Sequence, residues 1–118
     1  MNITVNQRTQ EGIQVAEIIG DIDRSTAQEI EARLLPQIQA GTRLILDMRG
    51  VNYMSSAGLR MLLIMYRELK EHQGEIALSG LSDRLQDIMA VTGFLKHFTI
   101  CQSVEQGVAL LQSPPESA

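Results

Sequence analysis

Hydrophobic and polar residues alternate along the first part of the chain. Ile3 and Val5 alternate with polar residues up to position 8, and a second apolar-rich run covers residues 13–19 after a polar turn. Period-two alternation on both sides of a turn predicts two paired strands. Over residues 27–38 the apolar positions recur at three- and four-residue steps instead, and this spacing predicts a first helix.

The first predicted helix is bounded by residues that favour a helix start and a helix end. Asp23 or Ser25 offers an N-cap, and Ser25 with Gln28 three residues later matches a capping box. Pro36 should bend or end the helix, because proline disrupts a helix interior. Asp21 and Asp23 could also be paired carboxylates for acid–base chemistry, but an aspartate before a helix more often caps its amides. We therefore favour a capping role over acid–base chemistry for Asp23.

The rest of the chain alternates short apolar runs with helical periodicity. Strands are predicted at residues 44–46, 75–80 and 98–101, and helices at about 56–73, 82–92 and 103–111. In this order each later strand follows a helix, so the crossovers should be right-handed and the sheet mostly parallel. The predicted fold class is α/β. We expect a single domain over residues 1–112, with a mixed five-stranded sheet and about four helices, and a short flexible C-terminal tail over residues 113–118.

The composition narrows the classes of function. The chain has 118 residues, of which 44% are hydrophobic and 20% charged, as in folded globular proteins. Its formal net charge of −4, without a dense basic run, disfavours direct binding to nucleic acid. The longest apolar run covers only residues 61–66, so we expect no membrane insertion. A single cysteine and a start without a signal-peptide pattern predict a cytoplasmic protein.

Residue patterns typical of catalysis or cofactor binding are missing from the sequence. No Gly-rich phosphate loop joins a strand to a helix, and His72 and His97 lack motif-spaced partners. No Cys/His/Asp cluster has zinc spacing, and Cys101 is expected to be a buried, unreactive thiol. We therefore predict no catalytic residue, no metal and no cofactor, and a protein that is not an enzyme.

The most informative pattern lies in residues 44–59, where a buried strand leads through a polar loop into a helix. Asp47 follows the strand at its carboxyl end, where α/β proteins often place functional groups. Ser55 and Ser56 lie at the start of the strongest predicted helix, and one of them should cap it. Gly58 is unfavourable in a first helical turn, which suggests that something approaches the backbone there. A docking surface at this helix start fits these residues.

This segment resembles the STAS-domain family of anti-sigma-factor antagonists. The resemblance rests on Leu46-Asp47 and on Met54-Ser55-Ser56-Ala57-Gly58-Leu59. It extends over nearly the whole chain, because residues 20–23 and the region of Gly93 and Phe94 also look like that family. In the family a serine two residues before the glycine is phosphorylated by an anti-sigma factor that is also a kinase, and this position is Ser56 here. The preceding residue is often Asp. Here Ser55 takes its place and is the second choice of acceptor, and Ala57 replaces a common Ser or Thr.

The resemblance implies a STAS-like domain that acts by partner switching. The unphosphorylated form would bind the anti-sigma factor, a serine kinase, and release sigma, whereas phosphorylation at Ser56 would block binding. A serine phosphatase would reset the switch. The main alternative is a STAS-like structural subunit of a signalling complex or a lipid-transport assembly, in which Ser56 only caps the helix. A small-molecule-binding enzyme is a third alternative, without a chemical feature to support it.

The predicted partner-binding surface surrounds the start of the second helix. A core stripe of Leu59, Leu62, Leu63, Tyr66 and Leu69 leaves Met61 and Ile64 on other sides of this helix. These two residues could form a contact patch, or neighbouring helices could cover them. The full set of residues predicted to bind the partner is Asp23, Asp47, Ser55, Ser56, Ala57, Gly58, Arg60, Met61 and Ile64.

Overall fold

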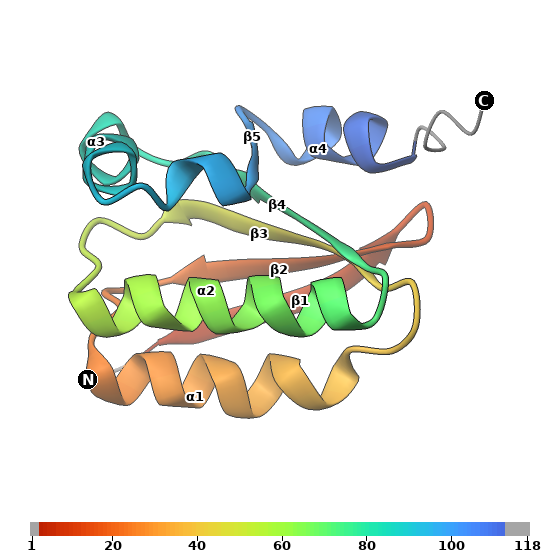
Figure 1. Ribbon diagram of the computed structural model, residues 1–118, viewed down its shortest axis with the longest axis horizontal. Helices are drawn as coiled ribbons and strands as arrows, with labels where there is room; N and C mark the ends of the chain where they lie inside the picture. Colours follow the sequence, from red (N-terminus) through yellow and green to blue (C-terminus); the bar gives the residue numbers. More distant parts are fainter. Residues whose placement is uncertain (1–2, 113–118) are drawn as a thin grey trace.

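Five strands form one mixed sheet in a computed structural model that describes residues 3–112 (Figure 1). The sheet order follows the chain, β1-β2-β3-β4-β5. β1 and β2 pair antiparallel, and each later pair of neighbours is parallel, as predicted. The strands are β1 (Thr4–Gln10), β2 (Ile13–Ile19), β3 (Arg43–Gly50), β4 (Glu75–Ser79) and β5 (Thr99–Cys101).

Helices cover both faces of this sheet. The helices are α1 (Arg24–Leu34), α2 (Ser56–Glu71), α3 (Asp83–Val91) and α4 (Val104–Gln112), with short 3-10 helices at Leu35–Gln37 and Leu95–His97. α1 and α2 lie side by side on one face, and α4 packs on the other (Figure 1). β3 is buried on both faces, which explains its unbroken apolar run. The predicted order of elements is confirmed.

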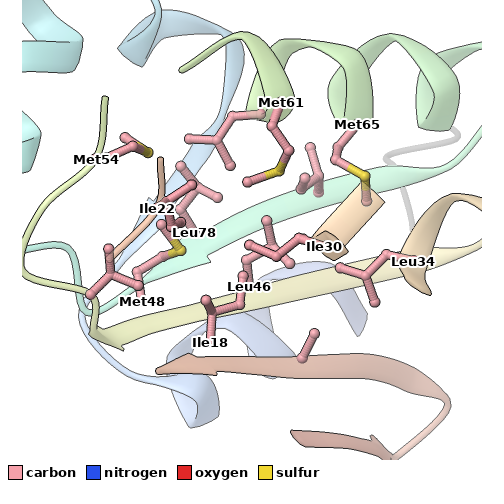
Figure 2. Packing of buried hydrophobic residues seen from close by; sticks show 14 of the residues in the cluster. Ile18, Ile22, Ile30, Leu34, Leu46, Met48, Met54, Met61, Met65 and Leu78 are labelled. Atoms are coloured by element: carbon pink, nitrogen blue, oxygen red, sulfur yellow. The ribbon is translucent and has the colours of Figure 1, made fainter. Parts of the chain in front are cut away.

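The larger core lies between the sheet and the α1–α2 layer (Figure 2). Alternate residues of β3, such as Leu46 and Met48, point into it, and Ile30 and Leu34 of α1 meet them there. A second cluster, which includes Ile45 of β3, fills the space under α4. One face of β3 therefore packs against α1 and α2 and the other against α4, and successive residues of the strand point to opposite faces.

The start of α1 differs in detail from the sequence prediction. Asp23, one of the two predicted candidates, is the N-cap, and its capping box is formed with Thr26. The Thr26 amide donates to Asp23 Oδ1 at 3.0 Å, and the Asp23 amide donates to Thr26 Oγ1 at 2.8 Å. The predicted box of Ser25 with Gln28 is wrong, because Asp23 starts the helix two residues earlier. α1 ends at Leu34, just before the 3-10 helix that contains Pro36.

The buried face of α2 also differs from the prediction. Met61 and Met65 are fully buried, whereas Leu63 and Tyr66 of the predicted stripe are only partly buried. α2 packs against the sheet and against α1 at once, so its apolar stripe is wide and includes both methionines (Figure 2). The prediction that Met61 lies on an accessible contact patch is wrong, since the side chain has 0% exposure.

Two further observations concern the extent of the described chain. No helix within residues 3–112 is long and apolar enough to cross a membrane. The predicted C-terminal tail, residues 113–118, lies outside the described residues.

Candidate functional site

Two loops bring the N-termini of α1 and α2 together. The loops after β2 and β3 continue side by side beyond the strands, because Gly20 N–H donates to Gly50 O at 3.0 Å. Further along, Ile22 N–H donates to Tyr53 O at 2.9 Å, and Ser55 N–H donates to Ile22 O at 2.8 Å. The parallel pairing of β2 and β3 is thus prolonged up to both helix starts. This places Asp23, the cap of α1, close to Ser55 at the start of α2.

Apolar side chains anchor both loops in the core. Ile22 and Met54 are buried, and they form an isolated parallel bridge between the two loops (Figure 2). Gly58 packs directly against this pair. A Cβ at position 58 would overlap with Met54 Cγ and lie 2.9 Å from Ile22 Cγ2. The close approach that Gly58 predicted is therefore internal, and its assignment to the docking surface is wrong because the residue is buried.

The two serines at the start of α2 have different roles. Ser55 is the N-cap, and its side-chain oxygen accepts a hydrogen bond from Ala57 N–H at 3.1 Å. Ser56 is the first helical residue and is exposed, and its hydroxyl has no hydrogen-bond partner among residues 3–112. The capping role therefore belongs to Ser55. The Ser56 hydroxyl is left accessible to a reagent that approaches from outside.

Asp23 contributes a fixed negative charge beside these serines. Its Oδ1 atom accepts from Thr26 N–H at 3.0 Å and from the Ser25 hydroxyl at 3.0 Å. The hydrogen bond from the Thr26 backbone, followed by that from Ser25, lowers the pKa of the Asp23 carboxyl. The carboxylate is therefore ionised at neutral pH, and its Oδ1 atom is engaged in the hydrogen bonds that cap α1.

Asp47 lies on the other face of the sheet. It alternates with Met48 along β3 and so shares the face of Ile45, which packs under α4. Its side chain is 1% exposed and accepts from Arg49 at two points, Nε at 3.1 Å and Nη2 at 2.9 Å. This hydrogen bonding to Asp47 raises the pKa of Arg49. The prediction that Asp47 contacts a partner is wrong, because the carboxylate is buried and turned away from the start of α2.

An open groove runs between the N-terminal halves of α1 and α2. Its volume is about 680 Å³. It contains Ser56 together with Arg60 and Ile64, two of the other residues predicted for the docking surface. The residues that line it come from both helices and are Asp23, Arg24, Ala27, Gln28, Glu31, Ser55, Ser56, Ala57, Arg60 and Ile64.

Four of the ten residues that line this groove, all of them in α1, were missed by the sequence prediction. Arg24, Gln28 and Glu31 of α1 line it, and their spacing of four and three places them on one face of the helix. This spacing of polar residues was the only feature of the sequence that could have indicated a polar face on α1. Nothing in the spacing of α1 alone, however, indicates that this face meets the start of α2, which lies about 30 residues later in the chain.

The groove offers a hydroxyl group together with acidic and basic side chains. Within the described residues, no three His, Cys, Asp or Glu side chains come together in a way that could hold a metal ion. Cys101 lies on the α4 side of the sheet, where burial raises the pKa of its thiol. The arrangement can present Ser56 to another protein that supplies the chemistry.

Comparisons with known proteins show what this chain is similar to. The family model for the STAS domain matches residues 4–107. A protein described as the anti-sigma factor antagonist BtrV, from Bordetella bronchiseptica, is 32% identical over 104 residues, which cover 87% of this chain and 90% of that protein. The anti-sigma-B factor antagonist of Listeria monocytogenes is 34% identical over 94 residues, which cover 79% of this chain and 82% of the relative. The crystal structure of an anti-sigma factor antagonist from Mycobacterium paratuberculosis has the same fold. Its TM-score is 0.79 at 24% identity, and the match covers 95% of this chain and 96% of that one.

Proposed function

Because this chain belongs to the STAS-domain family of anti-sigma-factor antagonists, we propose that it acts by phosphorylation-controlled partner switching. The unphosphorylated form binds an anti-sigma factor that is also a serine kinase, and sigma is released. Phosphorylation of Ser56 blocks this binding, and a serine phosphatase restores it. In this proposal the chain is a cytoplasmic regulator without enzymatic activity, and it does not itself contact nucleic acid or insert into a membrane.

The observation that carries the proposal is the difference between the two serines. Ser55 already accepts the Ala57 amide as the helix cap. Ser56 is exposed beside the groove, and its hydroxyl has no partner in the described part of the chain. Transferring a phosphoryl group to Ser56 therefore breaks no hydrogen bond of the fold, whereas transfer to Ser55 would remove a cap. This supports Ser56 as the acceptor over Ser55.

The reaction requires only the hydroxyl from this chain. Ser56 Oγ attacks the γ-phosphorus of ATP held by the partner kinase, and a new O–P bond forms. The bond between that phosphorus and the β–γ bridging oxygen breaks, and ADP leaves with the bond electrons. The serine proton passes to a base of the kinase. What the chain contributes is position, because α2 and the anchored loop fix where Oγ lies.

The added charge should affect binding more than folding. A phosphoserine carries about −1.5 to −2 charges at neutral pH, and the N-terminal end of α2 favours a negative charge through its dipole. The partner, by contrast, must accommodate a large hydrated anion where it met a small hydroxyl. A loss of about 1.4 kcal/mol in complementarity weakens binding tenfold. The fold can therefore persist while the complex dissociates.

The proposed docking surface is the groove side of α2 and α1. Ile64 is partly buried and lines the groove two turns after Ser56, where a bound partner would cover the rest of its side chain. Arg60 is exposed between these two residues. Apolar and charged groups together are typical of a reversible interface.

A binding titration with the cognate anti-sigma factor tests this proposal. Wild type and Ser56→Ala should bind. The chain with phosphoserine at position 56 should bind at least tenfold more weakly, and so should the separate variant Ile64→Glu. Leu110→Glu is the matched control, because Leu110 is an exposed apolar residue of α4 on the other face of the sheet. Equal binding of the phosphorylated and unphosphorylated chains would rule out the switch. It would then favour a structural role in a larger assembly.

A further inference from the structure

We propose that Arg60 and Arg24 hold the phosphoryl group of phosphorylated Ser56, so that phosphorylation occupies part of the groove between α1 and α2 from within the chain. This inference rests on the proposed phosphorylation of Ser56. It goes further by naming the residues of this chain that receive the phosphoryl group. Arg60 and Arg24 act as positioning residues of the phosphorylated state.

The first observation is that two arginines share the groove with Ser56. Arg60 follows Ser56 by one helical turn on α2, and residues four apart on a helix face each other with Cβ atoms about 5–6 Å apart. Arg24 begins α1 and lines the same groove from the opposite side. A guanidinium group presents planar paired donors that match the oxygen atoms of a phosphoryl group.

The second observation is that these guanidinium groups have no partners. Among residues 3–112, the ion pairs are Arg49 with Asp47 and His72 with Glu68, and no hydrogen bond involves the side chain of Arg24 or Arg60. The two arginines are unpaired within the described part of the chain, although acidic side chains line the same groove. Asp23 and Glu31 line the groove as well.

The carboxylates do not compete strongly for these arginines. Asp23 is occupied by its cap hydrogen bonds from Thr26 and Ser25. The side chain of Glu31, within the described residues, makes neither a hydrogen bond nor an ion pair. Two arginines and two carboxylates thus balance each other in the groove. A phosphoryl group brings about −1.5 to −2 charges into it, and the arginines are the cations available to pair with them.

The backbone at the start of α2 offers few free donors for this task. Ala57 N–H donates to Ser55 Oγ at 3.1 Å, and Gly58 N–H donates to Ser55 O at 2.9 Å. Leu59 N–H also donates to Ser55 O, at 3.2 Å. The first amides of α2 are therefore largely used by the cap residue. Most hydrogen-bond donors for the phosphoryl oxygens must come from side chains.

The arginine contact gives phosphorylation a second effect on binding. The phosphoryl group adds charge and bulk at Ser56, and it also draws Arg60 and Arg24 together across the groove. A partner that docks there meets a partly occupied groove, in which Arg60 and Arg24 already bind the phosphoryl group. Removal of Arg60 should therefore free part of the groove in the phosphorylated chain, although the phosphoryl group itself is still present.

The test measures the second pKa of the phosphoserine by phosphorus NMR. Phosphoserine is inserted at position 56 during translation, so no kinase is needed. Its second pKa is ordinarily about 6, and a nearby guanidinium lowers it by favouring the dianion. Arg60→Gln should raise this pKa by at least about 0.3, a twofold change in proton affinity and the scale of an exposed helical ion pair. Arg24→Gln should raise it further when the two changes are combined.

Matched variants separate the arginine contact from other influences. The groups that face the phosphoryl group, besides the two arginines, are Asp23 and Glu31, and they stay unchanged throughout. Arg67→Gln removes the same charge from α2, but residue 67 lies about 16 Å from Ser56 along the helix axis, beyond the screening length of about 8 Å. It should leave the pKa unchanged. Arg60→Lys, which keeps the charge but loses the planar donors, should give an intermediate value and serves if Arg60→Gln fails to fold.

The possible outcomes are distinct. An equal phosphoserine pKa in wild type, Arg60→Gln and the double variant would overturn the arginine contact. An equal rise in Arg60→Gln and Arg67→Gln would also overturn it, since only net charge would then matter. Neither result bears on whether a kinase modifies Ser56, because the phosphoserine is inserted without one. A kinase that ignores Ser56 would refute the proposed function and leave the NMR result as it stands.

Discussion

Replacing Gly58 with alanine should destabilise the protein, although alanine is the better helix former. The new methyl group would overlap with Met54 Cγ, and it would lie 2.9 Å from Ile22 Cγ2 and 3.0 Å from Met54 Sδ. Met54 Cγ is in the middle of its side chain, and Ile22 is β-branched and stiff at χ1. Both neighbours are buried in the core, so there is little free space into which either could move.

Two opposing effects set the size of the change. Alanine in place of glycine stabilises a helix interior by up to about 1 kcal/mol. An extra methyl group in a well-packed site costs about 1–3 kcal/mol. We expect the second effect to win, because the clash involves two buried side chains of the core. The free energy of unfolding of Gly58→Ala should be lower than that of wild type by about 1–2 kcal/mol.

Urea denaturation measures this difference, with Gly107→Ala as the matched control. Gly107 is also a helical glycine against the core, but its added methyl would meet the ends of side chains, Ile45 Cδ1 at 2.9 Å and Cys101 Sγ at 3.0 Å. Gly107→Ala therefore gains the same helix propensity but introduces a milder clash. Its free energy of unfolding should stay within about 1 kcal/mol of the wild-type value. The reasoning would be refuted if Gly58→Ala were as stable as wild type, or if Gly107→Ala lost more stability than Gly58→Ala.

Three further predictions concern other parts of the chain. Met61→Ala should lower the free energy of unfolding by about 2–5 kcal/mol, whereas Ile64→Ala, at a partly buried position, should lose clearly less; equal losses in urea titrations would contradict the burial of α2. Asp23→Ala should be less stable than wild type at neutral pH. Because the folded pKa of Asp23 is lowered, this difference is fully present above the ordinary carboxyl pKa of about 3.9 and fades as the pH falls below it; a difference that persisted unchanged at lower pH would contradict the charged cap, and Asp23→Asn is its uncharged control. The Cys101 thiol should react with a disulfide reagent much more slowly in the native protein than in the urea-unfolded chain, and equal rates would contradict its burial.

The order of the elements and the start of α2 could be predicted because both depend on patterns of residues that are close together in the sequence. The alternation around Val5 and Val15 marks the paired strands, and the serines before Gly58 mark the helix start. The exact cap of α1 was harder. Ser25 with Gln28 and Asp23 with Thr26 overlap, and only the structure shows that Asp23 and Thr26 form the box.

The surroundings of side chains depend on neighbours that are distant in the sequence. The spacing along α2 identifies apolar positions, but the packing of α2 against both α1 and the sheet decides that Met61 is buried. For Asp47, the position at the end of β3 suggested function, whereas its face of the strand directs it toward Arg49 and away from the groove. Likewise, Arg24 belongs to the groove only because the loops after β2 and β3 run together.

The most direct test of the account is site-resolved mass spectrometry after incubation with the cognate anti-sigma kinase and ATP. Ser55→Ala loses a cap, which costs about 0.5–2 kcal/mol, but it keeps the hydroxyl of Ser56. The account predicts one phosphoryl group on Ser56 in wild type and in Ser55→Ala, and none in Ser56→Ala. Phosphorylation of wild type at Ser55, or undiminished phosphorylation of Ser56→Ala, would contradict it.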